Sequence, residues 1–341
     1  MFTVHSGIME RRKFLNSLCL GTTAISSLNF NKVYNSFLND FPYKLSLAQF
    51  SLFRLEMNRQ IDPMDFAKIA SNLGFKGLEY LQMSYTGGLL NDKQTISLSS
   101  IKKLANDLNQ RANDNNMENV LIMIDIGPDL AKEINKTLDP YYIWIDCASE
   151  MNCHSVRVNL RGSDDNLIAW TNNSIQNLNK LCDYANPLGV NIIVENHGGY
   201  SSNADYLLNV IDSVDYNNIG TLPDFGNFCI RQDQNKTAEL FRLFREGSLS
   251  KDPPTIYDSC VEDYDMYEGV AKLMKNALGV SAKTHGFDAN GNDVDIDYKK
   301  MMKIVKDSNY DGFIGVEAQV FNMNPIDAIN ASKKLLLNSY I

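Results

Sequence analysis

Histidine is scarce in this sequence, and positive charge falls short of negative charge. The 341 residues include only four histidines, so a site built from many imidazole ligands is excluded. Lys and Arg number 32 against 41 Asp and Glu, which gives a net charge of −9. An acidic chain gains little from attraction to a phosphate backbone. We therefore expect no nucleic-acid partner, and a DNA-repair nuclease with a multi-zinc cluster is disfavoured for both reasons.

Long apolar runs and paired cysteine motifs are also absent. No apolar run approaches the roughly 20 residues that a membrane-spanning helix needs, so we expect no stable membrane insertion. The six cysteines form no C-x-x-C pair, and most have apolar or aromatic neighbours. We predict buried free thiols at these positions in preference to disulfides or a cysteine-based metal site. The cysteines are Cys19, Cys147, Cys153, Cys182, Cys229 and Cys260.

The N-terminal 30 residues have the layout of an export signal. Arg11 and Arg12 precede Phe14 and Leu15, and a weakly apolar run with small residues follows at 18–28. Arg-Arg-x-Phe-Leu resembles the twin-arginine signal of proteins that are exported folded. We expect residues 1–30 to be such a signal and the mature protein to be periplasmic. The alternative is a basic N-terminal helix on a cytoplasmic protein, and Met9 is a second candidate start.

After this segment the sequence alternates between strand-like and helix-like stretches, with no low-complexity tract or linker. Short apolar, β-branched runs predict strands at 45–51, 77–80, 119–125, 155–160, 190–195, 218–224, 279–284 and 312–317. Amphipathic stretches predict helices at 62–73, 98–115, 138–151, 166–187, 203–214, 237–245, 257–278, 297–308 and 325–337. Alternation of this kind gives a parallel sheet, and eight units close it. We predict an α/β protein with a single (β/α)8 TIM barrel over residues 43–341.

Acidic residues or a histidine stand at or just after four consecutive predicted strands. Glu195 ends the fifth strand, Asp224 the sixth and Glu317 the eighth, and His285 follows the seventh. The carboxyl ends of barrel strands meet at one face, where barrel enzymes carry their chemistry. Three carboxylates at one place repel one another unless a cation lies among them. The pattern therefore indicates a divalent metal site, with Mn, Mg, Co or Zn as candidate ions.

Several motifs extend this pattern along the chain. They are Gly74-Phe75-x-Gly77-Leu78-Glu79, Val194-Glu195-Asn196-His197-Gly198-Gly199, Pro223-Asp224-Phe225-Gly226-Asn227-Phe228, Ala282-Lys283 with Asp297-Tyr298, and Tyr310-x-Gly312-x-Ile314-Gly315-Val316-Glu317. From about residue 45 to the C-terminus, the chain resembles the xylose isomerase-like TIM barrel superfamily, the sugar phosphate isomerase/epimerase group. The resemblance implies that Glu195 and Glu317 bind a metal and pass a proton at a sugar carbon, and that Asp224 is a further ligand.

The sequence departs from the pattern of these relatives on the seventh strand. Relatives often carry a ligand histidine where this chain has Ser281, and often a histidine where it has Asn227. Strand alternation points Ser281, Lys283 and His285 to one side. His285 is therefore either a fourth metal ligand or a residue of the barrel mouth. Lys283 is a candidate catalytic residue that supplies the missing positive charge, or else an ion-pair partner of Glu317.

Five further residues are candidates for substrate contacts, each with a structural alternative. Glu79 would bind a sugar hydroxyl or pair with a cation in the barrel. Arg157 and Arg161 would hold a phosphate, carboxylate or carbonyl oxygen, although Arg157 is equally suited to an ion pair with a neighbouring acid such as Glu195. His197 would contact a hydroxyl or a backbone group. Asn227 would contact the substrate from the position where relatives have histidine.

The sequence leaves three functions open, all with a small carbohydrate as partner. The first is a metal-dependent isomerase or epimerase of keto sugars that transfers a proton at a carbon next to a carbonyl. The second is a lyase or dehydratase of keto sugars or keto-glycosides that uses the same intermediate to expel an oxygen. The third is a sugar-binding barrel without catalysis. The oligomeric state is open, with a homo-oligomer among the options.

Overall fold

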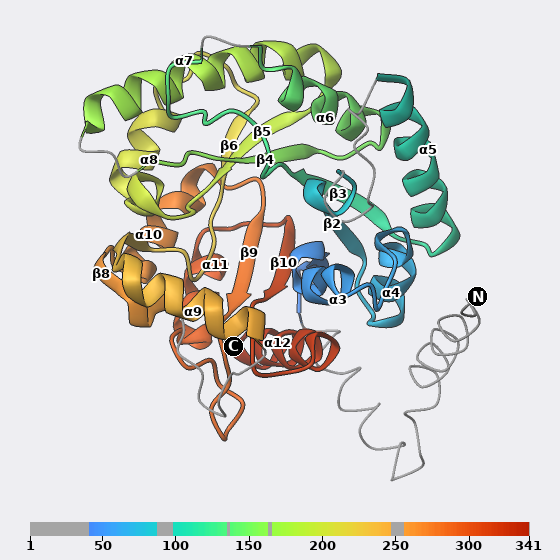
Figure 1. Ribbon diagram of the computed structural model, residues 1–341, viewed down its shortest axis with the longest axis vertical. Coiled ribbons are helices and arrows are strands. Elements are labelled where there is room, and N and C mark those ends of the chain that lie inside the picture. Colours follow the sequence, from blue (N-terminus) through green and yellow to red (C-terminus); the bar gives the residue numbers. More distant parts are fainter. Residues whose placement is uncertain (1–40, 87–97, 135–136, 163–165, 247–255, 341) are drawn as a thin grey trace, which may run out of the picture.

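Eight parallel strands form the central sheet of the protein (Figure 1). The computed structural model describes residues 41–86, 98–134, 137–162, 166–246 and 256–340, so the predicted export signal lies outside the described residues. The strands run in the order β6-β5-β4-β3-β2-β1-β10-β9. They are β1 (Lys44–Ala48), β2 (Gly77–Leu81), β3 (Glu118–Met123), β4 (Ser155–Asn159), β5 (Asn191–Glu195), β6 (Ile219–Leu222), β9 (Val280–Thr284) and β10 (Phe313–Ala318).

Backbone hydrogen bonds join the two edge strands of this sheet, β6 and β9. The amide of Phe225 donates to the carbonyl of Ser281 at 3.0 Å, and the amide of Ser281 donates to the carbonyl of Pro223 at 2.9 Å. Thr221 accepts from Leu278 nearby, so the contact continues along the edge. The sheet is thus closed into a (β/α)8 barrel, and the predicted fold class is confirmed.

Helices surround the barrel on its outer side (Figure 1). Several begin at an Asp or Asn whose side chain accepts backbone N–H groups of the first turn, as Asn203 does for Asp205 and Tyr206. The helices of the described residues are α3 (Phe53–Met57), α4 (Phe66–Asn72), α5 (Leu98–Asp114), α6 (Asp139–Glu150), α7 (Leu167–Ala185), α8 (Ala204–Ile211), α9 (Gln234–Glu246), α10 (Met266–Leu273), α11 (Tyr298–Asp307) and α12 (Pro325–Ser339).

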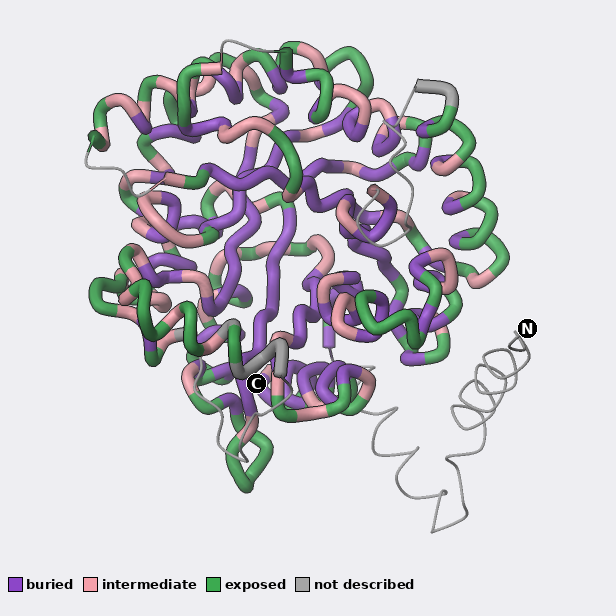
Figure 2. The backbone as a smooth tube through the Cα atoms, viewed as in Figure 1, coloured by how far each residue is buried: buried purple, intermediate pink, exposed green. Residues whose placement is uncertain are grey.

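The strands are buried along almost their whole length, whereas the helices bury only their inner faces (Figure 2). A large apolar cluster fills the space between strands and helices, and a smaller one includes Leu121, Ile193 and Leu222. A Cβ atom on Gly279 would meet all three of these side chains within 4 Å, so they converge on one point. Ile193 and Glu195 are two residues apart on β5 and share a face. The apolar layer therefore lies beneath the polar residues of the strand ends.

The segment after β6 differs from its prediction. Residues 257–278 were expected to be one helix, but they contain strand β8 (Cys260–Asp263) before the shorter helix α10. Strand β8 pairs in antiparallel fashion with β7 (Cys229–Gln232) to form a small separate sheet. Each of these strands has only four residues, too few to show a clear alternation of apolar and polar side chains.

A disulfide bond between Cys229 and Cys260 ties this two-stranded sheet together. The prediction of free thiols is therefore wrong for these two residues. It is confirmed for Cys147, Cys153 and Cys182, which are buried and unpaired, and Cys19 lies outside the described residues. The two bonded cysteines are 31 residues apart in sequence, and only the pairing of β7 with β8 brings them together.

Helices α5 to α8 and α10 to α12 pack around the barrel as parts of its outer layer, whereas α9 contacts the short 3-10 helix Ile256–Ser259. Among the described residues, every helix falls short of the length or the apolar character that crossing a bilayer requires.

Candidate functional site

Three buried carboxylates meet at the carboxyl end of the barrel. Glu195 ends β5, Asp224 follows β6 and Glu317 lies on β10, and each contributes an oxygen that lies within 4.8 Å of the others. Their exposed fractions are 1%, 0% and 6%. The structure therefore brings together the three acids that the strand-end pattern singled out, and we call them the acid cluster.

The ammonium group of Lys283 lies at the acid cluster. Its Nζ is 3.0 Å from Glu317 Oε1 and 3.4 Å from Asp224 Oδ2, and it donates to Asn227 Oδ1 at 3.2 Å. Burial opposes the charge of Lys283, but the neighbouring carboxylates outweigh that effect and raise its pKa above the usual value. Lys283 is therefore charged at neutral pH and supplies one positive charge to the cluster.

Arg157 on β4 supplies a second positive charge. Its Nε lies 2.9 Å from Glu195 Oε2, as the ion-pair alternative predicted, and Nη1 donates to Asp125 Oδ1 at 2.6 Å. Asp125 also accepts from Asn159 at 2.9 Å, so it fixes the guanidinium from the far side. Asp125 stands just after the apolar strand β3, much as Glu195 stands at the end of β5. This position in the sequence could have indicated its role.

Asparagine side chains hold the loop after β6 against the acid cluster. The amide of Asn196 donates to the carbonyl of Asp224 and accepts from its N–H, at 3.0 and 2.8 Å. Asn227 donates to Glu195 Oε1 at 2.9 Å, while Ser281 donates to Asp224 Oδ2 at 2.7 Å. Ser281 thus contacts the cluster directly from β9.

Burial changes the proton affinity of these acids. It raises the pKa of Glu195 to about 7 even though Arg157 lowers it, and it raises the pKa of Asp224 to about 6 against the effect of Lys283. Glu79 on β2 is also buried, accepts from Ser46 at 2.6 Å and has its pKa raised by burial to about 7. A carboxyl group with a pKa near 7 can both accept and return a proton at neutral pH.

His285 lies outside the acid cluster. Its Nδ1 is 2.9 Å from Asp295 Oδ2, and its buried Nε2 has no hydrogen-bond partner among the described residues. A Cβ atom on Gly226 would come within 2.7 Å of Nε2, so the ring packs against that glycine. The second acid beside it, Asp293, accepts backbone N–H groups and thereby shapes the loop. The structure therefore does not bring His285 to the three carboxylates, as the alternative of a fourth metal ligand required, but to Asp293 and Asp295.

A pocket of about 300 Å³ opens beside the acid cluster at the ends of β4, β5 and β6. Arg161, His197 and Asn227 line it, together with residues of β7. Burial lowers the pKa of His197 to about 4, so its imidazole is neutral at pH 7. Asn227 contacts both Glu195 and Lys283, which places the pocket next to the candidate catalytic groups. Its volume is at the lower end of small-molecule sites, which span about 300–1,000 Å³.

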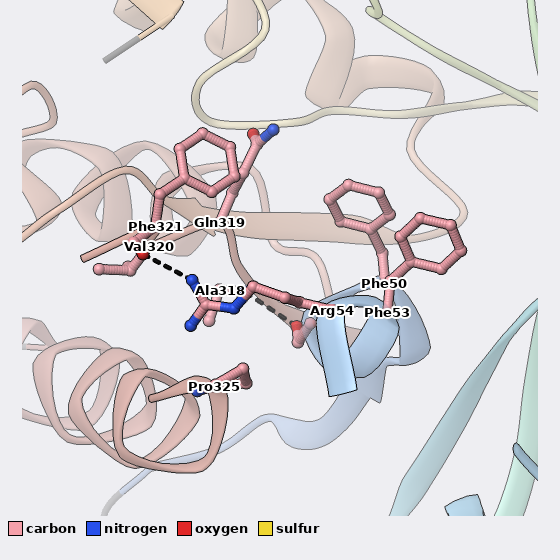
Figure 3. Close-up of a pocket in the computed structure, with 9 residues that line it drawn as sticks. Phe50, Phe53, Arg54, Ala318, Gln319, Val320, Phe321 and Pro325 are labelled. Carbon is pink, nitrogen blue, oxygen red and sulfur yellow. Dashed lines mark hydrogen bonds between the residues drawn. The ribbon is translucent and has the colours of Figure 1, made fainter. Parts of the chain in front are cut away.

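A second pocket lies between the ends of β1 and β10 (Figure 3). Phe50 and Phe53 form a stacked pair there, and Arg54 donates to the carbonyl oxygens of Phe321 and Met323. The pocket holds only about 40 Å³, close to the roughly 30 Å³ that one water occupies in the liquid. Arg54 thus holds the loop after β10 in place, and this pocket is too small for a sugar ring.

The donor chemistry of the acid cluster fits a divalent cation. The site holds the four buried acids Glu79, Glu195, Asp224 and Glu317 and the half-buried Asp125, against the two cations Arg157 and Lys283. Negative charge is therefore in excess, which favours binding of a cation. The ligands available are carboxylate oxygens, and oxygen donors suit Mg²⁺ and Mn²⁺ best.

The chain belongs to the xylose isomerase-like TIM barrel family, whose model matches residues 67–338. Among solved structures, it is similar to a sugar phosphate isomerase/epimerase from Parabacteroides distasonis ATCC 8503, with 12% identity, a TM-score of 0.58 and coverage of 93% of this chain and 97% of that one. A probable 3-DHS dehydratase from Bacillus anthracis shares 15% identity, with a TM-score of 0.56 and coverage of 86% and 98%.

A structure of the IOLI protein with a bound zinc atom is similar as well. Its identity is 12% and its TM-score 0.55, with coverage of 87% of this chain and 98% of that one. At such identities the likeness concerns the fold. A search of curated proteins finds no match. The solved structures similar to this fold thus include a sugar phosphate isomerase/epimerase and a probable dehydratase.

Proposed function

We propose that this protein is a metal-dependent isomerase or epimerase of a keto sugar. The observation that carries the proposal is the acid cluster, in which two glutamates from β5 and β10 lie on either side of Lys283 and Asp224 in a buried site next to a pocket. Isomerisation and epimerisation need a proton to leave and return at a carbon next to a carbonyl group. Two carboxyl groups that approach that carbon from different sides can perform both transfers.

The scheme assigns a role to each residue of the acid cluster and to Lys283. Glu195 accepts the proton, because its raised pKa makes it an effective base near neutral pH. Glu317, when it carries a proton, donates that proton to the opposite side of the same carbon, so that one proton leaves the substrate and one enters it. Lys283, charged and buried, stabilises the negative charge that develops on the substrate oxygen. Glu195, Asp224 and Glu317 are the residues that would hold a divalent ion, and this ion would polarise the substrate carbonyl.

Solvent deuterium exchange tests the two-base scheme. Keto sugars incubated with the protein in deuterated water should gain deuterium at the carbon next to the carbonyl, and Glu195→Gln and Glu317→Gln should each reduce this gain at least about 100-fold. Glu118→Gln, a change at an exposed strand position, is the matched control. Undiminished exchange in both site variants would contradict the proposal.

Product mass tells the proposed reaction from elimination. An isomer keeps the mass of the substrate, whereas a dehydratase or lyase that uses the same acids releases water or an alcohol. Binding of a keto sugar without exchange or product would instead indicate a barrel that binds sugar without catalysis.

We also propose that the protein works in the periplasm. The Arg11-Arg12 motif and the Cys229–Cys260 disulfide support this location, since disulfides persist in oxidising compartments. Replacing both arginines by lysine should retain the protein in the cytoplasm, as cell fractionation would show. Unchanged export of that variant would exclude the twin-arginine route.

A further inference from the structure

The pocket beside the acid cluster carries positive charge on an acidic protein. Arg161 follows β4 and Arg231 lies on β7, and both line the pocket. Among the described residues, no Asp or Glu lines it, although acids exceed bases by nine in the whole chain. Apart from the two arginines, His197 is the ionisable side chain of the lining. The two arginines therefore set the charge that a ligand in this pocket meets.

Neither arginine forms a buried ion pair of its own, since the carboxylate of Asp125, which also attracts Arg161, is paired with Arg157. Arg161 donates to the carbonyl oxygen of Asp125 at 2.6 Å, which is a neutral acceptor. Arg231 pairs with Glu262 at 3.2 Å through Nε, but both side chains are more than half exposed, at 63% and 52%. Exposed ion pairs of this kind are weak and screened by water. Both guanidinium groups thus remain able to bind an anion, and a planar guanidinium matches a carboxylate or phosphate.

The acid cluster orients such a ligand. Asn227 lines the pocket and contacts Glu195 of the acid cluster, where negative charge is in excess even with Lys283 present, so an anionic group is attracted to the arginines in preference to that side. The rest of the molecule then faces the glutamates. Strand β7, which carries Arg231, is fixed to β8 by the Cys229–Cys260 bond. The disulfide therefore holds one of the two cations at the pocket.

We propose that the pocket binds the anionic group, carboxylate or phosphate, of an acidic sugar, and that Arg161 and Arg231 are the residues that select it. The ligand class rests on the proposed function, whereas the selection of charge rests on the two arginines. Arg231 determines specificity from strand β7 of the two-stranded sheet, which lies outside the eight barrel units.

Binding of three probes by calorimetry tests this proposal without turnover. Glucuronate and glucose 6-phosphate should each bind the full-length protein at least about tenfold more tightly than glucose. Arg161→Gln and Arg231→Gln should each weaken the binding of the acidic probes by about tenfold and leave the binding of glucose unchanged. Arg242→Gln is the matched control, because Arg242 is an exposed arginine of α9 that also pairs with a glutamate.

The two acidic probes distinguish the anion. Tight binding of glucuronate alone identifies a carboxylate site, and tight binding of glucose 6-phosphate alone identifies a phosphate site. Equal affinity for glucose and both acidic probes, or acidic-probe affinity that survives both site variants, would overturn the proposal. Deuterium exchange with a neutral keto sugar would still support the proton-transfer function, so the two proposals can fail separately.

Discussion

Glu79 shows how a single buried acid affects this protein. It lies beneath the acid cluster on β2, and a Cβ atom on Gly315 would come within 2.3 Å of its Oε1. Only glycine at position 315 leaves room for this carboxyl group. Ser46 is its hydrogen-bond donor in the described part of the chain, so burial is only partly compensated.

Glu79 should make the protein less stable as the pH rises. Its pKa is about 7 in the folded state against a reference value of 4.5, so the folded state binds more protons between these values. The free energy of unfolding therefore falls through this window, by on the order of 3 kcal/mol for this residue. Glu79→Gln should remove that loss, and its melting temperature should exceed that of the wild type by more at pH 8 than at pH 5.

The measurement is calorimetry in the presence of a chelator at both pH values. The matched control is Glu118→Gln, at an exposed acid on β3. A difference between wild type and Glu79→Gln that stays the same at both pH values would mean that Glu79 does not titrate as inferred.

At the scale of elements, the two-stranded sheet of β7 and β8 depends on its disulfide. Each strand has four residues, and the register between them is irregular, so the hydrogen bonds of the pair are few. The cross-link closes a loop with a sequence separation of 31, for which the chain-entropy model gives about 3–4 kcal/mol.

Removing the cross-link should loosen this two-stranded sheet and leave the barrel intact. In Cys229→Ala/Cys260→Ala, amide hydrogen exchange should accelerate on β7 and β8 by at least about 100-fold, with no change on β1 to β6. Reductant should have the same effect on the wild type and none on the double variant. Unchanged protection of the β7 amides from exchange would show that packing alone holds the two-stranded sheet together.

At the scale of the whole molecule, the closed barrel concentrates charge at one end. Strands β5 and β6 pair with each other, whereas β10 is distant from both in sequence, and the closure between β6 and β9 brings Glu317 to Glu195 and Asp224. A divalent cation that binds the folded state alone should stabilise it by about 2.7 kcal/mol at 100 times its dissociation constant.

Addition of Mn²⁺ or Mg²⁺ should therefore raise the melting temperature of the wild type. The rise should be greater at pH 8 than at pH 6, because protons compete for Glu195 and Asp224, whose pKa values are about 7 and 6. Asp224→Asn should abolish the rise, and Glu118→Gln should keep it. A wild type that shows no such rise at either pH would argue against a metal at the acid cluster.

The sequence by itself determined the eight barrel units and three acids of the site. Strand and helix patterns are local, and parallel strands place their carboxyl ends at one face. Glu195, Asp224 and Glu317 could therefore be predicted to meet from their positions after apolar runs. The ion pair between Arg157 and Glu195 followed from the neighbouring ends of β4 and β5.

Only the tertiary structure decided which groups surround these acids. His285 is the first residue after β9 and turns to Asp295 in a loop shaped by Asp293, whereas Lys283 contacts the acids from within β9. The Cys229–Cys260 bond and the approach of Arg231 to the pocket depend on pairing between distant segments. Such pairing depends on contacts between segments far apart in the chain, which no local pattern of residues encodes.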